Sequence, residues 1–166
     1  MSGTVPAPVA RAPGAPVDVM LQYDASLGCC DVVFNGVDFA LDATPASAML
    51  MTLLAKRRAH PDDVLPNSVP DWHAPSQFNA RGGWCGDALD PAGARVGSRM
   101  WVFSRRLADE QTRVDIENCL VEAMAWLESV RGLALQVTVR WVAAQFLGYQ
   151  VRAGGTVLAL KKAFDA

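Results

Sequence analysis

The chain has 166 residues, of which 51% are hydrophobic and 19% are charged, and its 15 Lys and Arg against 17 Asp and Glu give a net charge of -2. This size and composition allow one sizeable buried core and exclude a disordered polypeptide. The lack of a cationic excess argues against nucleic acid as a partner, and no apolar run approaches the ~20 residues that cross a membrane.

The first 16 residues are rich in alanine and contain four prolines. Such a composition favours extended backbone and offers little surface to pack. The segment also lacks the continuous apolar stretch of a secretory signal, so we expect the chain to be soluble and intracellular when it is made. The sequence therefore predicts an extended arm at 1–16 and a single domain at 17–166.

Three β-rich runs follow the arm: VDVMLQYD at 17–24, CCDVVF at 29–34 and VDFALD at 37–42. The last two are separated by Asn35 and Gly36, the pair that best tolerates the positive φ angles of a tight turn. We therefore predict a β-hairpin that reverses at this pair.

The first predicted helix begins at Thr44 and Pro45, because a threonine oxygen can cap free amides and proline suits the first helical position. Pro61 marks its end, and the cations at 56–58 would complement the negative end of the helix dipole. Its apolar face consists of Met49, Leu50, Leu53 and Leu54.

A longer helix is predicted at about 109–130, with Gly132 in the position where helices often end in a left-handed conformation. Its apolar stripe consists of Ile116, Cys119, Leu120, Ala123, Trp126, Leu127 and Val130. A stripe of this kind at helical spacing is typical of a helix that packs on a core.

The segment 133–142 alternates apolar and polar residues, which predicts a strand with one buried face. Two further β-rich runs, FLGYQVR at 146–152 and TVLALKK at 156–162, flank Ala153-Gly154-Gly155. The three segments predict an antiparallel meander. Together with the hairpin and the two helices, this order predicts an α+β fold, in which a small antiparallel sheet packs on two helices.

The stretch from about residue 59 to 99 has no sustained period and is rich in Pro, Gly and Asp. Structureless loops longer than ~15 residues are uncommon in compact domains, so this long irregular loop needs a second surface to order it. It carries Trp72, Phe78 and Trp84, with Trp101 just beyond. Such rings often anchor protein interfaces, although each could equally cover the domain's own core.

Few residues in the sequence form a pattern that is typical of a catalytic or metal site. A small metal-dependent hydrolase would use His60, Asp62, Asp63 and His73, with Cys85 as a further candidate ligand. Neither a CxxC pair nor an HExxH motif occurs, and Pro-Asp-Asp after a helix is an ordinary turn. We therefore predict no cofactor and no metal, and keep the hydrolase as an alternative.

Five short motifs occur in order along the chain: YDASLGC (23–29), ALD (40–42), LLAKRRAHPDD (53–63), RGGWCGD (81–87) and GSRMW (97–101). Their order and spacing resemble the Mu-like phage tail baseplate proteins, which are similar to the sheath-contacting wedge component of contractile tails. The resemblance covers the whole chain after the arm.

One departure from the wider wedge family concerns the end of the long helix. That family often has a Glu-Pro-Arg triplet there, whereas Glu128-Ser129-Val130-Arg131 keeps an acid and a base without the proline. The contact made by the triplet is therefore not carried over to this chain.

The resemblance implies a non-enzymatic subunit of the virion tail baseplate, assembled in the host cytoplasm. It implies several copies, most simply six, around the central hub and spike proteins, bound to other wedge proteins and to the tail sheath by strand addition. A tail-assembly chaperone, absent from finished particles, remains an alternative. The predicted interface residues are Arg57, Arg58, Trp72, Phe78, Trp84, Trp101, Thr156, Val157, Leu158 and Leu160.

Overall fold

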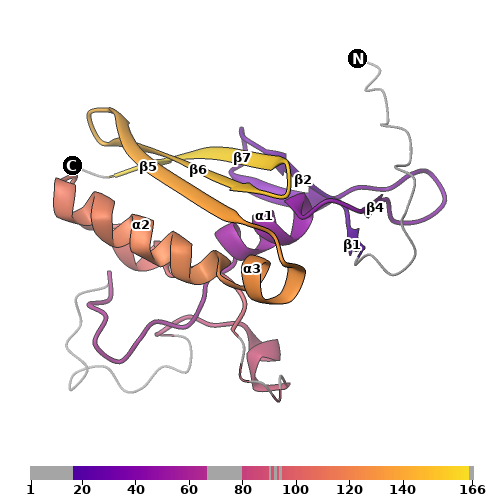
Figure 1. Cartoon of the computed structure of the whole chain (residues 1–166). Coiled ribbons are helices and arrows are strands. Elements are labelled where there is room, and N and C mark those ends of the chain that lie inside the picture. The colour runs from indigo at the N-terminus through magenta and orange to yellow at the C-terminus, as the bar shows by residue number, and fades with distance from the viewer. Residues whose placement is uncertain (1–16, 67–79, 90, 92, 94, 165–166) are drawn as a thin grey trace.

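The computed structural model describes residues 17–66, 80–89, 91, 93 and 95–164, and it confirms the α+β class (Figure 1). No helix within these residues is long and apolar enough to span a membrane. The α-helices are α1 (Ala46–Leu54), α2 (Glu110–Met124) and α3 (Trp126–Arg131), and the short 3-10 helices are η1 (Cys85–Leu89) and η2 (Met100–Phe103). The strands are β1 (Asp18–Val19), β2 (Leu21–Asp24), β3 (Cys29–Val32), β4 (Leu41–Asp42), β5 (Leu135–Ala143), β6 (Phe146–Ala153) and β7 (Thr156–Ala163).

The predicted C-terminal meander is confirmed. β5, β6 and β7 form one antiparallel sheet in that order, and α2 lies along one of its faces (Figure 1). Gly154 and Gly155 have φ angles of 53° and 80°, which a two-residue hairpin turn requires at both positions. Ala153 and Thr156 are therefore the pair that closes the turn.

The N-terminal strands pair differently from the prediction. The run at 17–24 is two strands, since β1 pairs with β4 while β2 pairs with β3. Between them, the N–H of Met20 donates to the carbonyl of Ala40. The Asn-Gly reversal exists but closes only one bridge, Phe34 to Phe39. The longer hairpin is β2–β3.

The Asn-Gly turn is a four-residue loop because of the Asn35 side chain. Its Oδ1 accepts the N–H groups of Val37 and Asp38 at 3.1 and 2.9 Å. These bonds favour an Asx-type turn over the tight two-residue turn that the dipeptide suggested.

α1 begins as predicted, with Pro45 before its first residue, and Thr44 Oγ1 accepts the N–H of Ala46. It ends at Leu54, well before Pro61, so its predicted C-terminal end was wrong. The reason is a tertiary contact, since the backbone on both sides of residue 56 bonds to Ser98 instead of continuing the helix.

The second predicted helix is divided into α2 and α3 at Ala125, where the N–H of Ala125 donates to Glu122 three residues back. Gly132 ends α3 in the left-handed conformation, as predicted, with φ of 63°. Val130 is 76% exposed, so its predicted place on the buried stripe was wrong. The tighter three-residue hydrogen bonds at Ala125 interrupt the regular α-helical spacing from which the stripe was predicted.

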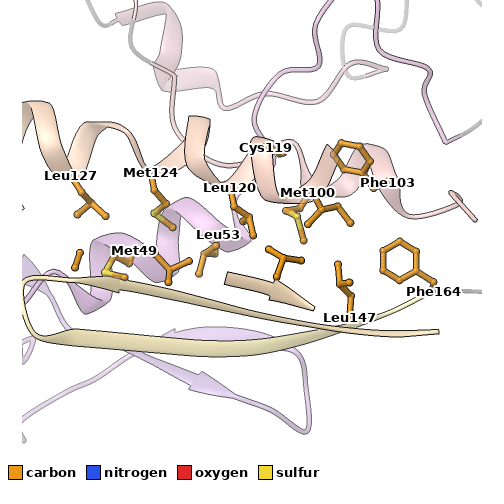
Figure 2. Close-up of a cluster of buried hydrophobic side chains, with 14 residues drawn as sticks. Met49, Leu53, Met100, Phe103, Cys119, Leu120, Met124, Leu127, Leu147 and Phe164 are labelled. Atoms are coloured by element: carbon orange, nitrogen blue, oxygen red, sulfur yellow. The ribbon is translucent and has the colours of Figure 1, made fainter. Parts of the chain in front are cut away.

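The core lies between the helices and the inner face of the C-terminal sheet. Figure 2 shows Leu120, Met124 and Leu127 pointing from the helices toward the strands, with Leu147 on the opposite side. Met49 and Leu53 of α1 fill the space beside them. Burial of these apolar side chains is the main favourable contribution to the folding free energy.

Candidate functional site

Three charged side chains hold the irregular segment against α2. Arg99 Nη1 donates to both carboxylate oxygens of Asp63 at 2.8 Å, and its Nη2 donates to Glu122 Oε2 at 2.6 Å. Arg99 and Asp63 retain only 15% and 18% of their side-chain exposure. We call these three residues the Arg99 network.

Contacts within the Arg99 network lower the pKa of its two carboxyl groups. Burial raises the pKa of Asp63, but the Arg99 hydrogen bonds and the backbone N–H of His60 lower it further, so the net shift is below the ordinary 3.8. For Glu122, burial is again opposed by Arg99 and by the charge of Arg57, and the pKa falls below 4.5. The ionised forms therefore stabilise the fold.

Two predicted interface residues are engaged inside the fold. Arg57 Nη1 lies 3.5 Å from Glu122 Oε1, and the backbone carbonyl of Arg57 accepts the indole N–H of Trp101 at 2.8 Å. Trp101 is partly buried, whereas Arg58 is exposed and lies beside Gly83. Trp101 therefore orders the segment after α1, and Arg58 is available to a neighbour.

Backbone and hydroxyl contacts bring three of the sequence motifs together. Ser98 Oγ donates to the carbonyl of Leu53 at 2.9 Å, and its N–H and carbonyl bond to Ala55 and Arg57. Farther along, the N–H of Ala59 donates to the carbonyl of Arg81 at 2.8 Å. The motifs at 53–63, 81–87 and 97–101 thus form one layer beside α2.

Trp84 lies at an apolar groove of about 730 Å³. Its side chain is 49% exposed and its ring rests on Gly86, where an added Cβ would lie 2.3 Å from the ring. Met51 of α1 and Val19 of β1 also line the groove and are 44% and 42% exposed. The other two predicted rings of the loop, Trp72 and Phe78, lie outside the described residues.

The two edges of the C-terminal sheet differ. On β5, Glu128 Oε1 accepts the N–H of Leu135 at 3.1 Å, and Arg113 Nη1 donates to the carbonyl of Val139 at 3.2 Å. Side chains of the helices therefore occupy part of this edge. Neither role could be predicted from the sequence, because each depends on a contact between distant segments.

β7 forms the other edge. Because Ala153 and Thr156 close the turn, alternate residues of β7 direct their N–H and carbonyl groups away from β6. Val157, Ala159 and Lys161 are these outward residues, and within the described part of the chain their N–H groups donate to no acceptor. Predicted residues Leu158 and Leu160 pack against the core instead.

The residues of the hydrolase alternative do not converge on a site in the part of the chain that the structure describes. Asp63 is bound by Arg99, His60 Nε2 lies 3.7 Å from Glu122 Oε1, and Asp62 and Cys85 are exposed. No group of three potential metal ligands occurs among the described residues, and His73 lies outside them.

The motifs that form this layer all lie within the part of the chain that is similar to known proteins. A model of the protein family described as "Phage protein GP46" matches residues 45–157. The chain belongs to this family. It is also 29% identical to the "Baseplate protein gp46" of Escherichia phage Mu over 110 residues, 66% of this chain and 68% of the relative. The expected membership of a Mu-like baseplate protein family is confirmed.

The GP46 match begins at the start of α1 and ends in β7, so it includes the whole Arg99 network and the β5 edge. It is narrower than the expected resemblance, which began at residue 17. At the position of the missing triplet, Arg131 Nη2 bonds to Asp18 at 2.5 Å while Glu128 caps β5. In this GP46 protein, the acid and the base therefore both make contacts within the chain.

Proposed function

We propose that this chain is a structural subunit of a phage tail baseplate and acts in its wedge, where it connects wedge proteins around the hub and spike to the tail sheath. The baseplate role follows from membership of the GP46 family and the similarity to the phage Mu baseplate protein. The observation that carries the connecting role is the open backbone edge of β7, opposite a β5 edge that the chain's own side chains occupy.

Strand addition to β7 would use its outward N–H and carbonyl groups. Main-chain hydrogen bonds supply affinity in this mode, and alternate side chains set the register. Lys161 and Lys162 lie near the end of the strand, and lysines on an edge discourage pairing with unrelated chains. A sheath segment is the partner that we propose for this edge.

The groove at Trp84 is the second proposed contact, and it would receive another wedge protein. Half-exposed aromatic and apolar side chains around a hollow are typical of interface anchors. We expect each baseplate to contain several copies of the chain, six in the simplest arrangement. This role requires no catalytic group, and the chain would be found in finished virion tails after assembly in the host cytoplasm.

Hydrogen exchange tests the role of β7. In the isolated chain we expect fast exchange at Val157, Ala159 and Lys161, and in assembled tails a slowing of roughly 100-fold or more as partner hydrogen bonds form. The control is Leu135 on β5, whose N–H is already bound by Glu128 and should change little. Equal exchange of β7 in both states would remove strand addition from the proposal.

A Trp84→Ala variant tests the groove. Because the ring is half exposed, the variant should keep its fold by circular dichroism, while its incorporation into tails falls by about tenfold or more. Leu107→Ala is the matched control, since Leu107 is 79% exposed and does not line the groove. Wild-type incorporation of the Trp84 variant would exclude the groove as a contact. Mass spectrometry of purified tails separates a structural subunit from an assembly chaperone.

A further inference from the structure

The outer face of the C-terminal sheet, turned away from α2, carries cations without acids. Strand alternation assigns one set of side chains to this face, and the set contains three cations and no carboxylate. Its members are Gln136, Thr138, Arg140, Val142, Phe146, Gly148, Gln150, Arg152, Val157, Ala159, Lys161 and Ala163. Most of them are exposed, which leaves a basic surface open to solvent.

These cations differ from the arginines on the helical side. There, Arg57, Arg99, Arg106, Arg113 and Arg131 each form an ion pair with a carboxylate. Within the described residues, no carboxylate forms an ion pair with the cations of the outer face. Lys161 contacts an aromatic ring, with its Nζ 6.0 Å from the centroid of Phe146. The positive charge of this face is therefore not neutralised by these residues and is complementary to carboxylates of a binding partner.

The register places two of the cations on either side of a glycine. Arg140 on β5 is opposite Gly148 on β6, and Gly148 is opposite Lys161 on β7. Because neighbouring strands lie about 4.8 Å apart, the two cations arise roughly 10 Å apart across a position with no side chain. The Val142 side chain lies over this glycine, since an added Cβ there would be 2.7 Å from Val142 Cγ1. A carboxylate placed beside Val142 would be within reach of both cations.

A groove lies over this position. It has a volume of about 620 Å³ and is lined by Arg140, Gly148 and Lys161 from the sheet. Tyr23 of β2 and Ala25 of the adjoining turn also line it. The groove is open and partly polar, which suits an extended polar segment better than a small apolar ligand.

We propose that this groove binds an acidic, extended segment of another baseplate subunit, with a carboxylate held between Arg140 and Lys161. The proposal rests on the baseplate role but not on strand addition to β7, because it uses side chains and not the strand edge. Complementary charge of this kind favours the correct partner and increases the rate of association.

Zero-length carbodiimide cross-linking of purified tails tests the contact, because this reagent joins a lysine amine only to a carboxylate that touches it. We expect a cross-link from Lys161 to an Asp or Glu of another subunit, and none from the exposed Lys56. If Lys161 in tails is acetylated as readily as in the isolated chain, or is protected without any carboxylate link, the proposal is wrong. Absence of the chain from tails would instead contradict the proposed function.

A pair of variants provides an independent test. Arg140→Gln with Lys161→Gln should keep the fold, because both side chains are exposed, and should lower incorporation into tails about tenfold. Arg140→Lys with Lys161→Arg should restore it, since the charges return. Arg105→Gln, at an exposed cation outside the sheet, is the control. Equal incorporation of the Gln pair and this control would overturn the proposal.

Discussion

A Gly97→Ala substitution is expected to lower the free energy of unfolding by about 3 kcal/mol. The added Cβ would lie 2.4 Å from the carbonyl oxygen of Ala55 and 2.9 Å from the backbone nitrogen of Arg57. Those two groups bond to Ser98, so the clash would break the bridge that ends α1. The φ of Gly97, +97°, adds backbone strain for any other residue. Urea unfolding of both chains measures the difference.

Gly28→Ala is the matched control. Gly28 also has a positive φ, +65°, but an added Cβ there meets nothing within 4 Å. Its cost should therefore be limited to backbone strain, about 1 kcal/mol. If both variants lost the same free energy of unfolding, close packing at Gly97 would not contribute to stability.

An Asp63→Asn substitution is expected to cost about 2 kcal/mol at pH 7, because it leaves the largely buried Arg99 with one charged partner instead of two. The folded pKa of Asp63 lies below 3.8, so its carboxylate stabilises the fold above that value and loses this effect as the pH falls through the folded pKa. The difference in the free energy of unfolding between wild type and variant should therefore be largest at neutral pH and decrease below about pH 4.

The neighbouring Asp62 provides the control for this effect. It is exposed, so Asp62→Asn should change the free energy of unfolding by less than about 0.5 kcal/mol at any pH. Denaturant unfolding at several pH values between 7 and 2 would compare the three chains. A cost of Asp63→Asn that is independent of pH would contradict the assignment of its effect to the ion pair with Arg99.

Most of the regular elements could be predicted from local sequence. The alternation at 133–142 and the Gly154-Gly155 pair led to the correct meander, and the capping residue Thr44 gave the start of α1. In each case the signal and the structure that it specifies lie within a few residues of one another, so local propensity was sufficient.

The candidate site was only partly predictable. Trp84 is half exposed on irregular backbone, so its interface role stays a prediction, whereas Trp101 bonds to the Arg57 carbonyl within the chain. The roles of Glu122 and Arg113 were missed, because charged residues on a helix are usually solvated, and nothing in their spacing identifies a partner in another segment.

The sequence by itself determined the class of the fold, the helical and β periods and the order of the motifs, because these depend on neighbouring residues. Only the tertiary structure decided where α1 ends, which strand edge is occupied and which cations lack a carboxylate. Those outcomes depend on hydrogen bonds and ion pairs between residues far apart in the chain, such as Arg99 with Asp63 and Ser98 with Leu53. These hydrogen bonds and ion pairs stabilise the fold by more than the intrinsic helix or strand propensity of each segment. They form only after the core has brought the segments together.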